Sequence, residues 1–234
     1  MLLGGCAAPV ETAIAGGPQP SADSSVPNEL LPYYEQKLSW VTCGESKAYC
    51  STLEVPADWN NPEGSRFKLA IVYRKATGTK PIGSLLFNPG GPGTSGVSWV
   101  RDSGDQIGTS TLRSNYNIVG FDPRGVGDSE PIVKCLTNKE KDEMFYGASA
   151  SPVGSAQEVA ETRAKMKKYV AACVKNTGAG LQFIDTVSAA KDMDIIRSVF
   201  GEAKINYLGY SYGTYLGSAY AQLFPKRVGH VVLD

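Results

Sequence analysis

The feature that most constrains the fold is an alternation of short apolar segments with amphipathic ones. The apolar segments, the first three of which end in glycine-rich turns, are residues 84–88, 116–122, 204–210 and 228–233. Apolar residues recur at helical spacing at about residues 156–175, 186–200 and 214–224. Strands that are apolar throughout are typical of a parallel sheet buried on both faces. The sequence therefore predicts an α/β domain with a mostly parallel sheet and helices on both faces.

Two further strands are expected ahead of this alternation, at residues 53–56 and 67–73. Residues 7–30 are rich in Ala, Pro, Ser and Gly without periodicity, which is typical of a flexible tether. No internal repeat is visible. We therefore expect one α/β domain at residues 31–234, preceded by a tether and the remnant of an export signal at residues 1–30.

The export signal is suggested by Leu2-Leu3-Gly4-Gly5-Cys6, which resembles the end of a bacterial lipoprotein signal. This match lacks the basic segment that should precede it, and its apolar run is too short to direct export. Two interpretations stay open: the chain as given begins too late, or the match is accidental. The first predicts a secreted or envelope-anchored bacterial protein with a lipid anchor at Cys6.

The charge balance excludes some classes of partner. The 23 Lys and Arg residues equal the 23 Asp and Glu residues, so the formal net charge is zero. Nucleic acids and anionic membranes select a basic excess, so we expect no nucleic-acid partner. The sequence contains no run of about 18 apolar residues, so it predicts no internal membrane-spanning helix. The sequence has neither a Cys-x-x-Cys pair nor a Cys/His cluster, the patterns that indicate a structural zinc site. We therefore expect no metal and no cofactor.

The five cysteines favour an oxidising compartment. They are Cys6, Cys43, Cys50, Cys135 and Cys173. The economical interpretation pairs Cys43 with Cys50 and Cys135 with Cys173, which leaves Cys6 unpaired. Five reduced, buried cysteines in a cytosolic protein are the alternative.

Residues 209–213, Gly-Tyr-Ser-Tyr-Gly, match the G-x-S-x-G pattern of a nucleophile elbow. The pattern follows an apolar strand and precedes the helical segment 214–224, which is the strand–turn–helix context that an elbow requires. The flanking glycines relieve clashes around a strained Ser211, and Gly217 allows the helix to approach the sheet. We expect Ser211 to be a nucleophile, although an inert serine in a glycine-rich turn is the alternative.

Residues 88–93, Asn-Pro-Gly-Gly-Pro-Gly, follow an earlier strand and predict an oxyanion loop. Acyl transfer requires backbone N–H donors close to the developing oxyanion. We expect one donor to be Tyr212, the residue after the nucleophile, and the second to be Gly91 or, failing that, Gly90. A phosphate-binding loop is disfavoured because the Gly-Lys-Ser/Thr ending is absent. A plain tight turn stays open.

Three motifs together resemble a known family. Residues 88–96, 121–129 and 209–217 occur in the order and spacing of the secreted tripeptidyl aminopeptidase-like branch of the proline iminopeptidase family, found in actinobacteria. The resemblance covers residues 38–234, including the four cysteines expected to pair and the stretch from Trp40 to Pro56. It implies an α/β-hydrolase fold.

The resemblance also implies an activity. It is that of a serine peptidase releasing short peptides, of the tripeptidyl type, from free N-termini through an acyl-enzyme on Ser211. In this family the turn at residues 122–129 borders the site. We expect Arg124 and Asp128 to hold this turn by an ion pair rather than to act in catalysis.

The rest of the catalytic triad is not evident. In this fold the order is Ser, then Asp or Glu, then His. After Ser211 the only acid is Asp234, and the only His is His230, which lies in the expected strand 228–233. Asp234 follows the His, so we expect neither to complete the triad and the chain to be the N-terminal portion of an enzyme. An esterase or lipase on the same scaffold, or an inactive truncated surface protein, are the alternatives.

Overall fold

The structure is a computed structural model that describes residues 16–21, 23–44, 47–147 and 151–234. Cys6 and the expected export signal lie outside the described residues. Within them the strands are β1 Val41–Cys43, β2 Ala48–Pro56, β3 Arg66–Arg74, β4 Gly83–Asn88, β5 Tyr116–Phe121, β6 Ile205–Gly209 and β7 Val228–Leu233. The α-helices are α1 Leu31–Tyr34, α2 Gly96–Ser103, α3 Ser110–Asn115, α4 Asn138–Tyr146, α5 Ala156–Thr177, α6 Thr186–Val199 and α7 Tyr212–Leu223.

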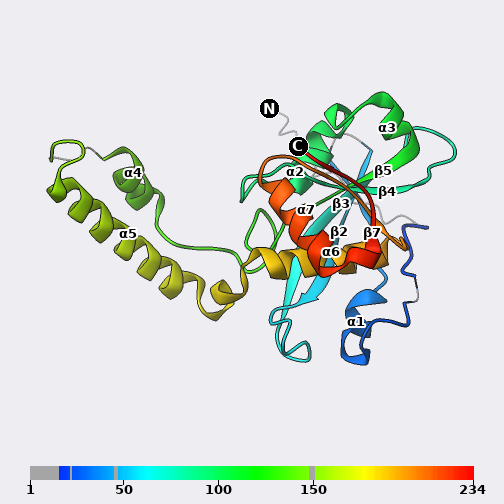
Figure 1. Cartoon of the computed structure of the whole chain (residues 1–234), viewed down its shortest axis with the longest axis horizontal. Coiled ribbons are helices and arrows are strands. Elements are labelled where there is room, and N and C mark those ends of the chain that lie inside the picture. The colour runs from blue at the N-terminus through cyan, green and yellow to red at the C-terminus, as the bar shows by residue number, and fades with distance from the viewer. Residues whose placement is uncertain (1–15, 22, 45–46, 148–150) are drawn as a thin grey trace, which may run out of the picture.

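The strands of the described residues form one mixed sheet, in the order β1-β2-β3-β5-β4-β6-β7. β4, β5, β6 and β7 run parallel, as predicted from their apolar sequences. β1, β2 and β3 form antiparallel pairs, and β3 joins the parallel half through an antiparallel pairing with β5. This confirms the predicted α/β class, and it puts the carboxyl ends of β4, β5 and β6 at one edge of the sheet (Figure 1).

Alternate residues of the central strands pack on opposite faces of the sheet. Leu86 of β4 belongs to a core that includes Met193 of α6 and Leu216 of α7. Its neighbours in β4 belong to a second core that includes Val97 and Val100 of α2. This is the twofold alternation of a strand that is buried on both sides, and each fully buried Leu or Phe contributes about 1.5–3 kcal/mol.

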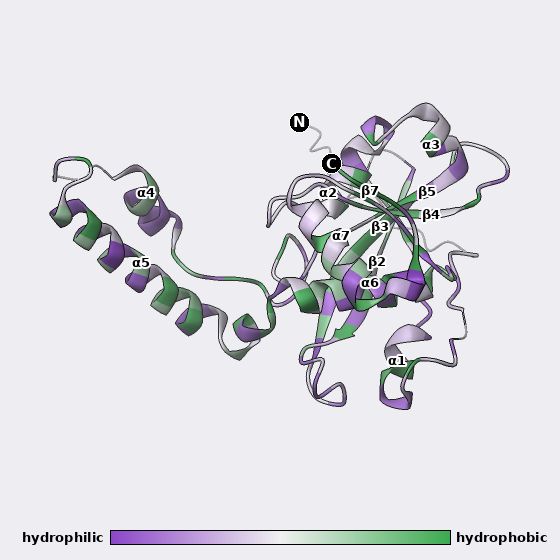
Figure 2. Cartoon of the chain, viewed as in Figure 1, coloured by the Kyte–Doolittle hydropathy of each residue, from purple (hydrophilic) through white to green (hydrophobic). Residues whose placement is uncertain are grey.

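Helices α4 and α5 form an arm that extends away from the sheet (Figure 1). The helix predicted at 156–175 is confirmed as α5, but it covers no face of the sheet, contrary to expectation. Hydrophobic residues recur along α5 (Figure 2). Several of their side chains are exposed, among them Val159, Met166, Val170 and Val174. The chain leaves the domain after the 122–129 turn and rejoins it at α6. Both α4 and α5 belong to this excursion, so α5 does not pack on the sheet.

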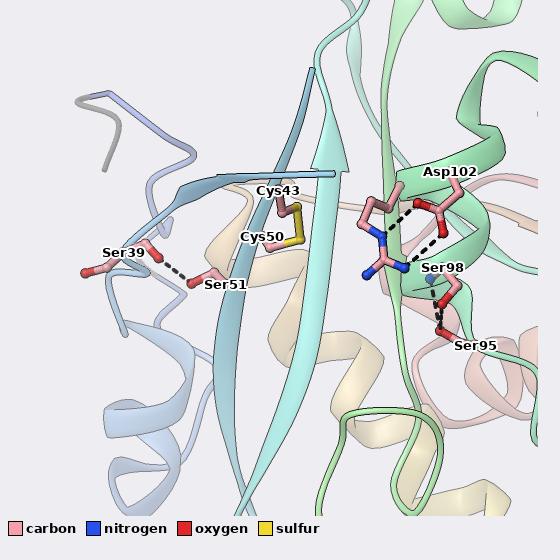
Figure 3. Close-up of a disulfide and its surroundings, with 8 residues drawn as sticks. Ser39, Cys43, Cys50, Ser51, Ser95, Ser98 and Asp102 are labelled. Carbon is pink, nitrogen blue, oxygen red and sulfur yellow. Dashed lines mark hydrogen bonds and ion pairs between the residues drawn. A yellow bond between two sulfur atoms is a disulfide. The ribbon is translucent and has the colours of Figure 1, made fainter. Parts of the chain in front are cut away.

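Both predicted disulfides are present. Cys43–Cys50 joins β1 to β2 across their turn, with an S–S distance of 1.99 Å (Figure 3). Cys135–Cys173 joins the segment before α4 to the last turns of α5, with an S–S distance of 2.07 Å. The second bridge therefore closes the arm near the point where it leaves the domain.

Part of the expected tether is docked on the domain. The Asp23 carboxylate lies 3.2 Å from an Arg197 guanidinium nitrogen and 2.9 Å from one of Arg227. Val26 is buried, and the Ser21 N–H donates to the Ser198 carbonyl at 3.1 Å. These contacts attach the segment to α6 and to Arg227.

Candidate active site

Ser211 occupies a strained turn between β6 and α7. Its backbone has φ +52° and ψ −119°, and among the described residues it is the only non-glycine residue with positive φ. Such a conformation costs about 1–3 kcal/mol and persists only where the surroundings enforce it. Here the Ser211 N–H donates to the Asp234 carbonyl at 2.7 Å, and the Gly213 N–H donates to the Tyr210 carbonyl at 2.7 Å.

The glycines around the elbow are required by close contacts. A Cβ on Gly209 would lie 2.5 Å from the Gly213 carbonyl oxygen, and one on Gly213 would lie 2.8 Å from the Asn88 carbonyl oxygen. A Cβ on Gly217 would lie 2.5 Å from a ring carbon of Tyr207 in β6. The close approaches predicted at these glycines are confirmed.

The loop after β4 lies directly against this elbow. Gly90, Gly91 and Gly93 all have φ between +99° and +110°. A Cβ on Gly90 would lie 2.9 Å from the Ser211 Cβ and 2.6 Å from the Tyr210 carbonyl oxygen. Only glycine permits both these dihedrals and this approach.

Buried Asn88 joins the loop to the elbow. Its carbonyl accepts from the Tyr210 N–H at 3.0 Å, and its side-chain Oδ1 accepts from the Gly90 N–H at 2.9 Å. In the part of the chain that the structure describes, the N–H groups of Gly91 and Tyr212 donate to no protein acceptor. The Gly91 N–H and the Tyr212 N–H, which follows Ser211 in the chain, are thus available to a ligand, whereas the Gly90 N–H is occupied.

Asp122 organises the turn at residues 122–129. Its buried carboxylate accepts from the Ser95 hydroxyl at 2.6 Å, the Val97 N–H at 3.1 Å and the Asp128 N–H at 3.2 Å. These bonds fix the turn to the N-terminus of α2 and hold it at the same sheet edge as Ser211.

The expected ion pair of Arg124 with Asp128 is wrong, because Arg124 pairs with Asp192 of α6. Two guanidinium nitrogens lie 2.6 and 2.8 Å from the two Asp192 oxygens, and both residues are buried. The remaining Arg124 donors reach the carbonyls of Pro56, Ala57 and Phe183.

Asp192 gave no signal in the sequence, since it lies 68 residues from its partner within a helix. Burial raises the pKa of Asp192 to about 6, and the hydrogen bonds and charge of Arg124 limit the rise. The two hydrogen bonds from the Arg124 guanidinium favour the charged form of this carboxyl. The role of Arg124 is structural, as expected, although its partner is different.

A cavity of about 590 Å³ opens between the loop after β4, the 122–129 turn and the start of α6. Tyr212 lines it, and the Tyr212 hydroxyl is hydrogen-bonded to the Thr186 hydroxyl at 2.8 Å. Tyr169 of α5 lines it too, so the arm contributes to its wall. Most other lining groups are apolar, which suits an apolar portion of an acyl substrate.

His230 is far from Ser211. Its backbone N–H and its ring both contact Asn206 at 3.2 Å, and its side chain is exposed. Asn206 is near the start of β6, five residues before Ser211, which corresponds to about 16 Å along a strand. Asp234 lies beside Ser211 through its backbone carbonyl. The structure therefore places Asp234 beside Ser211, but not His230, the only His of the sequence.

Neither a metal-ion cluster nor a membrane-spanning helix is found among the described residues. No group of three or more His, Cys, Asp or Glu side chains there is arranged to hold a metal ion. None of the helices described there has the length and apolar character needed to cross a membrane.

A strand–serine–helix elbow beside a glycine-rich loop, at the carboxyl edge of a parallel sheet, is the arrangement of an α/β hydrolase. Residues 83–234 match the sequence family described as alpha/beta hydrolase fold, and the chain belongs to this family.

Curated relatives share much of this sequence. Serine protease Hip1 of Mycobacterium tuberculosis is 39% identical over 212 residues, covering 87% of this chain and 40% of that protein. Tripeptidyl aminopeptidase of Streptomyces lividans is 39% identical over 189 residues, covering 79% and 34%. Carboxylesterase B of Mycobacterium tuberculosis is 38% identical over 210 residues, covering 84% and 38%. The chain thus spans well under half the length of these relatives.

Proposed function

We propose that the chain carries the nucleophile and oxyanion hole of a serine hydrolase. Ser211 is the nucleophile, and the N–H groups of Tyr212 and Gly91 stabilise the oxyanion. The observation that carries the proposal is the positive φ of Ser211. Strained backbone conformations of this kind cluster at active sites. Gly91 is preferred to Gly90 because the Gly90 N–H is occupied by Asn88.

A serine hydroxyl requires an adjacent base to act as a nucleophile. His230 is the only His of this sequence, and it lies at the far end of β6 and β7. We propose that the catalytic acid and base come from outside these 234 residues, which the greater length of the relatives supports.

The proposed substrate is a peptide with a free N-terminus, from which tripeptides are released through an acyl-enzyme on Ser211. The support is the likeness to proteins named serine protease and tripeptidyl aminopeptidase. Esterase activity is the second candidate, favoured by the likeness to a carboxylesterase and by the apolar cavity beside Tyr212.

Export to the bacterial envelope or beyond is part of the proposal. Two disulfides support it, because such bonds persist in oxidising compartments. A lipid anchor at Cys6 is proposed on the sequence alone. Metabolic labelling with a palmitate analogue tests this anchor. The parent protein must incorporate the label, and the Cys6→Ser variant must not.

The test of function uses the polypeptide encoded by the complete reading frame, assayed with N-terminally free and blocked peptides and with p-nitrophenyl esters. Release of tripeptides from free N-termini, at a kcat/KM above that for the esters, supports the peptidase. Turnover of esters alone supports the esterase. Ser211→Ala must abolish either activity, whereas Ser218→Ala, an exposed serine of α7, must not.

A further inference from the structure

A second cavity, of about 400 Å³, lies at the opposite end of the sheet from Ser211. Arg74, which ends β3, lines it and pairs with Ala48 of β2 and Ile118 of β5. Ile118 is near the amino end of β5, whereas Ser211 follows the carboxyl end of β6, and both strands run parallel to β4. The cavity is therefore separate from the candidate active site.

The side chains around this cavity are strongly basic. Lys47, Arg74, Lys75 and Arg113 line it, and Asp105 is the single acid among the lining residues. The Asp105 side chain is 72% exposed, so its charge is screened by water. The lining therefore carries an excess of three positive charges, although the net charge of the whole chain is zero. Such a local excess attracts anions. We call this site the basic cavity.

Several of these side chains are held in place. The Arg113 guanidinium donates to the carbonyls of Ile107 at 3.1 Å and Gly108 at 2.7 Å. The Lys75 ammonium lies 5.1 Å from the centre of the Tyr49 ring. Lys47 lies between β1 and β2, in the segment that the Cys43–Cys50 disulfide closes. Arg113 and Lys75 therefore each make a contact that orders the side chain before an anion binds.

Arg74 is the most informative member of the basic cavity. One of its terminal nitrogens is buried and has no hydrogen-bond partner among the described residues. The carboxylate oxygen of Asp105 lies 3.7 Å from it, beyond hydrogen-bond distance. The Gly104 backbone packs against the guanidinium: a Cβ there would lie 2.5 Å from the Arg74 Cδ. This nitrogen is covered by Gly104 and faces no solvent, but the Arg74 side chain as a whole is 21% exposed and lines the cavity.

We propose that the basic cavity binds a small multivalent oxyanion of the phosphate class, with Arg74 as its principal ligand. The planar guanidinium fork matches two phosphate oxygens, and Lys75, Lys47 and Arg113 balance the remaining charge. This site is independent of the hydrolase proposal, because none of its residues takes part in the chemistry at Ser211.

Isothermal titration of the complete polypeptide with inorganic phosphate and pyrophosphate tests this site. We expect both to bind, pyrophosphate more tightly because it carries more charge, and binding to weaken as sodium chloride is raised. Arg74→Gln and Lys75→Gln must each weaken pyrophosphate binding about tenfold or more. Arg66→Gln and Lys68→Gln, on the same strand but outside the cavity, must leave it unchanged.

Two results would overturn the proposal. One is the absence of pyrophosphate binding by the folded parent protein at low ionic strength. The other is binding that Lys75→Gln leaves intact, since Lys75 is exposed and its loss does not threaten folding. Hydrolase activity is measured on the same variants, and we expect it unchanged, which separates failure here from failure of the hydrolase proposal.

Discussion

Gly90 and Ser211 lie so close together that a methyl group on Gly90 would sit 2.9 Å from the Ser211 Cβ. This contact brings the oxyanion loop of β4 onto the elbow of β6. A Cβ on Gly90 would also lie 3.3 Å from the Tyr212 nitrogen, one of the two proposed oxyanion donors. The geometry of the site therefore depends on the absence of a side chain at one position.

The first prediction concerns that position. Gly90→Ala must push the loop away from the elbow and lower kcat about 100-fold or more, because a displacement of about 1 Å has that effect at a catalytic site. Gly93→Ala is the matched control: Gly93 has a similar φ, but a Cβ there meets nothing within 4 Å. Equal losses in both variants would show that the dihedral angle, not the contact, is what matters.

The second prediction concerns the buried pair of Arg124 and Asp192. Arg124→Met must lower the free energy of unfolding by about 3–5 kcal/mol, because it leaves a buried carboxylate without its counter-charge. Adding Asp192→Leu must restore much of that loss. Urea denaturation measures both, with Asp128→Asn as a control of little effect. Recovery by Asp128→Asn instead would contradict the pairing seen here.

The elbow could be predicted from the sequence, but the partner of Arg124 could not. Gly209, Ser211 and Gly213 form a local motif whose backbone requirements are contained in five consecutive residues. The partner of Arg124 depends on how α6 packs under the 122–129 turn, which no local pattern encodes. The same holds for α5: its periodicity predicted a helix, but periodicity does not say what the apolar face packs against. Its exposure followed only from the path of the chain.

The third prediction concerns pH and the docked N-terminal segment. Hydrogen bonds from Ser25, with the charges of Arg227 and Arg197, hold the pKa of Asp23 below its ordinary value of 3.8. A lowered pKa means that Asp23 stabilises the fold above that value, and that this stabilisation is lost as the pH falls through the lowered pKa. Asp23→Asn must lower the free energy of unfolding by about 0.2–1 kcal/mol at pH 7.

Urea denaturation at a series of pH values checks this effect. The difference between Asp23→Asn and the parent must shrink as the solution is acidified below pH 3.8. Asp142→Asn, an exposed residue of α4, serves as the control. A difference that grows on acidification would contradict the sign.

The fourth prediction concerns the disulfide of the arm. Cys135–Cys173 closes a separation of 38 residues, for which the loop-entropy model gives about 4 kcal/mol. Replacing both cysteines by serine must make the arm more mobile and speed tryptic cleavage within α5, where lysines are frequent. Near-ultraviolet circular dichroism must retain the signal of the sheet domain. Loss of that signal at the same rate as cleavage would mean that the arm and the domain unfold as one unit.

The central claim is that Ser211 is the nucleophile, and labelling with a fluorophosphonate probe tests it most directly. The complete polypeptide is treated with the probe and digested, and the modified peptide is identified by mass spectrometry. The account predicts one adduct, on Ser211, that Ser218→Ala keeps and Ser211→Ala loses. An adduct on another residue, or none on the folded and complete protein, would contradict it.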